Sequence, residues 1–140
     1  MPPADEAAVN ATLTTEPGRA LLRALVDYGA YVVDDTFWDA QQFCVESGVQ
    51  DEFQAAWGLA MTGQVPEGEG RRAEEQARAA VRGRGAAVPP AEAVASDPST
   101  AFLLDVTRLS VAMHVVSNSA ASRVGGGGSP RVDPPPPIGN

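Results

Sequence analysis

The first helical pattern in the chain has clear start and stop signals. Thr14 and Thr15 can cap a helix with their hydroxyls, and Pro17 falls in the first turn, where its missing N–H breaks no hydrogen bond. Leucine and valine then recur at positions 21, 22, 25 and 26, which lie on one helical face. Gly29 can take the left-handed conformation that ends a helix. We therefore predict a helix over residues 16–29.

A short apolar run follows this helix. Residues 30–33 read AYVV, which is too brief for a helix and rich in β-branched and aromatic side chains, so we predict a strand. Thr36 and Asp39 have the spacing of a capping box, with aspartate in place of glutamate. We expect them to open a second helix that continues to Ser47 and is stopped by Gly48.

A third, shorter helix is predicted next. Asp51 can cap it, Phe53 and Trp57 give it an apolar side, and Gly58 can end it. We expect these aromatic residues to anchor the core, because large apolar side chains are scarce in this chain. Cys44 is the single cysteine, so no internal disulfide can form, and we expect it to be a small buried hydrophobe.

The pattern changes between residues 62 and 99, where glycines and prolines are frequent. Residues 71–82 have good helix propensity, but Val81 is their only apolar residue other than alanine. We therefore predict a linker or insertion, with at most a solvated helix. Order is expected to resume at Thr100, and the apolar stripe of this last helix consists of Phe102, Leu103, Val106, Leu109, Ala112 and Met113.

Together these patterns predict an α+β protein, predominantly helical with one or two short strands, and with a disordered linker and C-terminal tail. The tail contains four consecutive glycines and four consecutive prolines. The predicted segments are a flexible N-terminus over 1–14, a helix–strand–helix–helix block over 15–61, the linker or insertion 62–99, a helix with a possible strand over 100–118, and the tail 119–140. Whether residues 114–116 extend the last helix or form a strand stays open.

Composition and charge narrow the classes of partner. The chain has 140 residues, is 44% hydrophobic and carries a net charge of −8. The net negative charge lies in the first 61 positions, which carry ten acidic residues and two arginines, whereas acids and arginines cancel in the rest of the chain. An acidic folded unit repels phosphate backbones. The basic stretch 71–84 is interleaved with Glu74 and Glu75 and lacks aromatic residues for stacking. We therefore expect no nucleic acid partner.

No membrane span is expected either, because no apolar run approaches the required ~18–20 residues. The first six residues resemble no signal peptide, since they have neither a basic nor an apolar region.

Candidate chemistry is concentrated after the predicted strand, at Asp34, Asp35, Trp38 and Asp39. These carboxylates could contact a cation or a sugar, and the indole could stack on a sugar ring. The structural alternative is that the acids form a turn and a helix cap while Trp38 is buried. We expect no catalytic residue, no metal and no cofactor, because His114 is the only histidine and has no positioned nucleophile.

Two segments carry a family resemblance. YGAYVVDDTFWD at 28–39, preceded by TEPGRALLRALVD at 15–27, and LSVAMHVVSNSAASRVGGGGSPRVDPPPPIGN at 109–140 resemble the C-terminal part of an uncharacterised family of secreted or cell-surface bacterial-type proteins. The chain departs from the family pattern at Phe37 and at residues 117–119, which read SNS in place of a paired asparagine, and it lacks the family's large β-rich N-terminal portion.

The resemblance implies an extracytoplasmic location and, as partners, the missing N-terminal domain or a carbohydrate. We expect a non-catalytic module or fragment of a larger extracytoplasmic protein of unknown function. Two alternatives stay open. One is a part of a carbohydrate-binding or carbohydrate-active domain that uses the acidic and tryptophan surface, and the other is an interaction adaptor that acts through the proline-rich tail.

Overall fold

A computed structural model describes residues 3–30, 44–83 and 97–114 of the chain. These residues are 69% helix and contain no strand, so the predicted α+β class is wrong for this part of the chain. Residues 31–33 of the predicted strand lie outside the described residues, and Ala30 belongs to no strand. The described helices are α1 (Pro3–Asn10), α2 (Glu16–Asp27), α3 (Val49–Trp57), α4 (Glu67–Arg82) and α5 (Pro98–Ala112).

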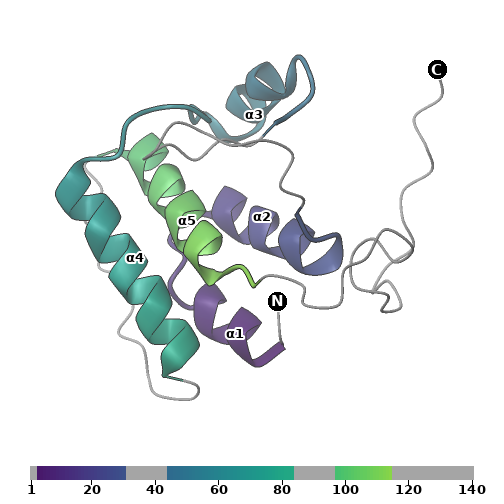
Figure 1. Cartoon of the computed structure of the whole chain (residues 1–140). Helices are drawn as coiled ribbons and strands as arrows, with labels where there is room; N and C mark the ends of the chain where they lie inside the picture. Colours follow the sequence, from purple (N-terminus) through teal and green to yellow (C-terminus); the bar gives the residue numbers. More distant parts are fainter. Residues whose placement is uncertain (1–2, 31–43, 84–96, 115–140) are drawn as a thin grey trace.

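Helix α5 is the centre of the bundle. It runs alongside α4 and also packs on α2 and α1, whereas α3 lies apart at one end (Figure 1). Leu109 on α5 is fully buried and belongs to a cluster with residues of α1, α2 and the turn between them. The cluster consists of Val9, Leu13, Leu22, Leu25, Val26, Leu109 and Ala112.

Helix α2 begins and ends where the local sequence signals place it. Thr15 is its N-cap and accepts a hydrogen bond from the Gly18 amide, and proline follows in the first turn. Gly29, just beyond the helix, has a φ of 78°. Such a conformation suits glycine because it has no Cβ. The predicted helix is confirmed, with its end two residues earlier than expected.

Helix α1 occupies residues that we expected to be flexible. Val9 is fully buried and Leu13, just after the helix, is nearly so. Both side chains belong to the core cluster. Packing on other elements therefore orders a helix too short to be stable alone in water.

Helix α4 lies within the segment predicted as a linker or insertion. It packs along α5 and buries three alanines at helical spacing, Ala73, Ala77 and Ala80. Alanine adds little apolar area by itself, but its small side chain allows two helices to approach closely. The helix that we expected to be solvated is therefore an integral part of the bundle.

Helix α3 has no buried residue. It starts at Val49, two residues before the expected cap Asp51, and ends at Gly58 as predicted, with a φ of 68°. Residues 44–47 are not helical, so the C-terminal part of the predicted second helix is wrong, while positions 36–43 lie outside the described residues.

Two burial predictions near α3 are also wrong. Cys44 is exposed, and Trp57 keeps 45% of its surface exposed. Among the helices described, none is long and apolar enough to cross a membrane.

Candidate functional site

The buried face of α5 carries two charged residues. Asp105 is fully buried and Arg108 is 5% exposed, while Leu103 and Val106 of the predicted stripe are only half-buried and Met113 is exposed. The helix is therefore rotated about its axis relative to the prediction. A buried charge is costly unless it is paired and hydrogen-bonded. The partners of the Asp105 carboxylate therefore indicate whether it belongs to a functional site or stabilises the fold.

Asp105 receives hydrogen bonds from the turn between α1 and α2. The backbone amides of Thr14 and Thr15 donate to its carboxylate at 3.1 and 2.8 Å. The Thr15 hydroxyl donates to Oδ2 at 2.7 Å, and the Thr14 hydroxyl donates to Oδ1 at 3.3 Å. The carboxylate also lies beside the N-terminus of α2, where negative charge is favourable. These donors replace the water that the carboxylate loses on burial.

The cap of α2 and the buried carboxylate share one hydroxyl. Thr15 Oγ1 donates to Asp105 and accepts from the Gly18 amide at 3.1 Å. A Cβ at Gly18 would lie 2.5 Å from Asp105 Oδ2 and 2.8 Å from its Cβ. Only glycine allows α2 and α5 to come this close.

Arg108 extends the network to α4. Its Nη1 donates to Asp105 Oδ1 at 2.8 Å. Its Nη2 and Nε donate to Gln76 Oε1 on α4 at 3.0 and 3.3 Å. The network formed by Thr14, Thr15, Gln76, Asp105 and Arg108 therefore joins the α1–α2 turn, α4 and α5. The two charged groups of the network, Asp105 and Arg108, pair with each other, as expected for a network that stabilises helix packing.

A second buried acidic side chain lies near the C-terminal end of α5. Asp5 on α1 is 1% exposed, and its Oδ2 lies 3.3 Å from His114 Nε2, just after α5. The half-exposed imidazole thus connects the C-terminal end of α5 to the start of α1. The sequence pattern predicted no partner for His114.

The pKa of an acidic side chain is lowered at the N-terminus of α5. The side chain and backbone amide of Thr100 donate hydrogen bonds to the Asp97 carboxylate and lower its pKa below the usual value. Asp97 is exposed, and its carboxylate acts as the N-cap of α5.

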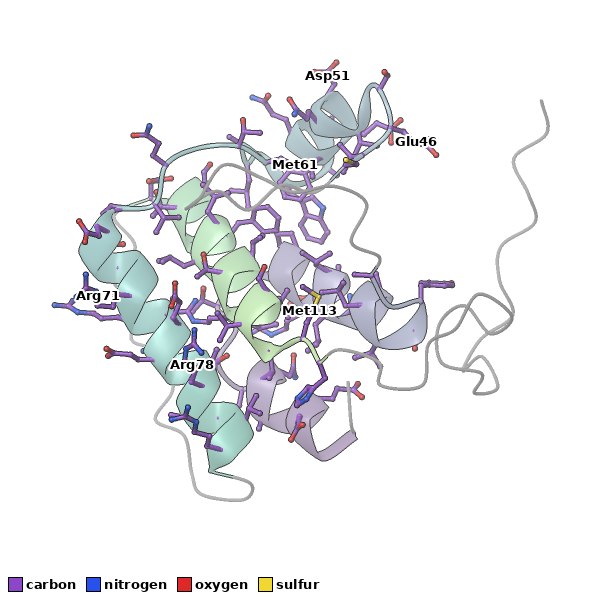
Figure 2. All side chains as sticks on the ribbon, viewed as in Figure 1. Glu46, Asp51, Met61, Arg71, Arg78 and Met113 are labelled. Carbon is purple, nitrogen blue, oxygen red and sulfur yellow. The ribbon has the colours of Figure 1, made fainter. Side chains whose placement is uncertain are left out.

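Helix α3 and its flanking residues present apolar side chains to solvent. Val45 and Trp57 are exposed, and Val49, Phe53, Leu59 and Met61 are half-buried. We call these six residues the α3 apolar surface. The Phe53 ring contacts the Phe102 ring of α5 with centroids 4.8 Å apart. Figure 2 shows Met61 between α3 and α5, and Glu46 and Asp51 on the outer side of α3.

The residues predicted from the sequence as a ligand site are Asp34, Asp35, Trp38 and Asp39, and all four lie outside the described residues. Their role stays a prediction. Within residues 3–30, 44–83 and 97–114, no group of three or more histidine, cysteine, aspartate and glutamate side chains is arranged to hold a metal ion.

Sequence reasoning missed the Asp105 network. Two signals could have indicated it: an aspartate and an arginine three residues apart inside an apolar stripe, and a glycine inside a strongly patterned helix. Comparison with protein-family models, curated proteins and solved structures found no match. The resemblance of segments 15–39 and 109–140 therefore remains an expectation from the sequence.

Proposed function

We propose that the chain is a non-catalytic helical module that acts as part of a larger extracytoplasmic protein. The observation that carries this proposal is the Asp105 network. A catalytic acid or base must reach its substrate, whereas the Asp105 carboxylate is enclosed by donors of its own chain. A buried network with satisfied partners favours a single packing of the helices, which is what a structural module requires.

The motifs at 28–39 and 109–140 support the second part of the proposal, because they resemble the C-terminal part of larger secreted or cell-surface proteins. The acidic N-terminal half agrees with a role that involves no nucleic acid. The module would then serve to join or present other domains.

The experiment has two parts. Thermal unfolding of the full chain, followed by circular dichroism at 222 nm, should show one cooperative transition that moves to lower temperature in Asp105→Ala. An antibody raised against residues 67–82 should detect a species larger than 14.5 kDa in the extracytoplasmic fraction of the source cells. A non-cooperative melt would contradict the module, and a 14.5 kDa species confined to the cytoplasm would contradict the larger protein.

A further inference from the structure

His114 is the only histidine in the chain, and it lies between the ends of two helices. Its Nε2 is 3.3 Å from Asp5 Oδ2. The imidazole is 44% exposed, whereas the Asp5 side chain is 1% exposed. Histidine is the side chain whose charge ordinarily changes between pH 5 and 8. The contact therefore connects a group that can gain a charge in this pH range to a carboxylate that the fold encloses.

Each member of the Asp5–His114 pair lies at a helix end that suits its charge. Asp5 is in the first turn of α1, where a negative charge is favourable. His114 follows α5, which ends at Ala112 and has no basic residue in its last turn. The free carbonyl groups at a helix C-terminus favour a cation. A protonated imidazole would thus interact with the carboxylate on α1 and with the C-terminal end of α5.

Helix α1 depends on contacts of this kind because it is short. It has eight residues, and a helix of this length is not stable alone in water. Its core contacts are made by Val9, near its C-terminal end, and by Leu13 just beyond it. The Asp5–His114 pair acts at the other end, where it connects the first turn of α1 to the end of α5 (Figure 1).

The neighbouring charged groups differ from His114 in their response to pH. They are carboxylates and guanidinium groups, which ordinarily keep their charge from about pH 5.5 to about pH 8. These groups are Glu6 on α1, Arg23 and Asp27 on α2, Arg78 and Arg82 on α4, and Arg108 on α5. A change in the docking of α1 over this pH range therefore reports on the imidazole.

We propose that protonation of His114 regulates the docking of α1 on the bundle. In the protonated form the imidazolium pairs with the Asp5 carboxylate and holds the first turn of α1 against the end of α5. In the neutral form this ion pair is lost, and α1 opens more often. Because the proton favours the docked form, its contribution is present below the ordinary titration range of histidine and is lost as the pH rises through that range. The inference does not depend on the proposed membership in a larger protein.

Hydrogen exchange of the full chain, measured by mass spectrometry at about pH 5.5 and about pH 8, tests the proposal. Each rate is divided into the intrinsic rate of an unfolded chain at the same pH, which gives a protection factor. For residues 3–13, the protection factor of the wild type should exceed that of His114→Gln about two- to fivefold at the lower pH. The two proteins should be equally protected at the higher pH. Proton NMR of the single imidazole verifies its charge at each pH.

Matched variants separate the pair from other groups that respond to pH. His114→Gln keeps Cys44 and the amino terminus, so the comparison with the wild type cancels their effect, since thiols and α-amino groups ordinarily titrate near pH 8. Asp5→Asn should lower the protection of α1 at the lower pH to the level of His114→Gln. Glu52→Gln removes one exposed carboxylate from α3 and should behave as the wild type. The amides of residues 49–57 should be equally protected in the wild type and in His114→Gln at both pH values.

Four results would overturn the proposal. They are equal protection of α1 in the wild type and His114→Gln at about pH 5.5, an equal ratio of protection at both pH values, equal losses in Asp5→Asn and Glu52→Gln, and a neutral imidazole at about pH 5.5. Asp5 is buried, so Asp5→Asn can fail to fold. The comparison of the wild type with His114→Gln then decides, because the substituted side chain is partly exposed. These failures leave the module proposal standing, because that proposal fails on a non-cooperative melt or a cytoplasmic 14.5 kDa product.

Discussion

Asp105 connects parts of the molecule that are 90 residues apart in sequence, because its carboxylate accepts hydrogen bonds from Thr14 and Thr15. Gly18 lies against the same carboxylate, and Arg108 links it to Gln76. At the scale of the residue, the specificity of the fold therefore depends on one buried acid and the glycine that makes room for it.

Removing the buried carboxylate should be strongly destabilising. Asp105→Ala leaves Arg108 buried without its ionic partner and takes the acceptor from two amides, which should cost about 3–5 kcal/mol of unfolding free energy in urea. Asp51→Ala removes an exposed acid and should stay within about 0.5 kcal/mol. Similar losses in the two variants would show that the network contributes little.

Gly18→Ala should also destabilise the chain. In an exposed helix interior this change is usually favourable by up to about 1 kcal/mol. At Gly18 the new methyl group would overlap Asp105, so we expect a loss of about 1–3 kcal/mol in urea unfolding. Gly68→Ala in α4 is the control, because nothing lies within 4 Å of its added Cβ. A stabilised Gly18→Ala protein would contradict the close approach of α2 and α5.

At the scale of the element, the helices differ in how they are specified. Helix α2 and the end of α3 follow capping signals that act within a few residues. Helix α4 is positioned by its alanine stripe against α5, and α1 by two core residues at its C-terminal end. Capping could be read from the sequence, whereas the burial of alanine could not, because alanine is equally common on exposed helix surfaces.

Enlarging the alanine stripe should separate α4 from α5. Ala77 is fully buried, so Ala77→Leu should overpack the interface and lower the unfolding free energy by about 1–3 kcal/mol. Ala79 is exposed on the same helix, and Ala79→Leu should change the stability by about 0.5 kcal/mol or less. Equal effects of the two changes in urea unfolding would exclude tight packing of α4 on α5.

The cap of α5 makes a pH-dependent contribution. The pKa of Asp97 is lowered in the folded state by its hydrogen bonds from Thr100, so the ionised carboxylate stabilises the fold at pH values above the ordinary pKa of an aspartate side chain. The contribution is lost as the pH falls through the lowered folded-state pKa. The melting temperature of the wild type should therefore exceed that of Asp97→Ala at pH 6, and the difference should shrink toward pH 2. A constant difference over this range would contradict the charged cap.

At the scale of the whole molecule, stability is distributed unevenly. Helix α5 is surrounded by α1, α2 and α4, whereas α3 buries no residue. A helix with few buried apolar contacts opens locally at a lower free energy than the core of a bundle. The described part of the molecule thus consists of a packed four-helix bundle and a less protected helix, α3.

Hydrogen exchange of the free chain should reveal this difference. Amides of α3 should exchange through local opening at a much lower free energy than those of α5, whose exchange should approach global unfolding. Mass spectrometry of peptides covering residues 49–57 and 98–112 measures both helices in one experiment. Equal protection of the two helices would show that α3 is part of the cooperative unit.

Local signals in the sequence determined that α2 exists, where it begins and where α3 ends, because capping and glycine conformation depend on neighbouring residues. They did not reveal that α1 and α4 belong to the bundle or that Asp105 faces inward with Arg108. Tertiary structure decided these points, because the burial of alanine or of a carboxylate depends on partners supplied by distant segments. It also decided that Trp57, an expected core anchor, stays half-exposed, since no other described element covers α3 completely.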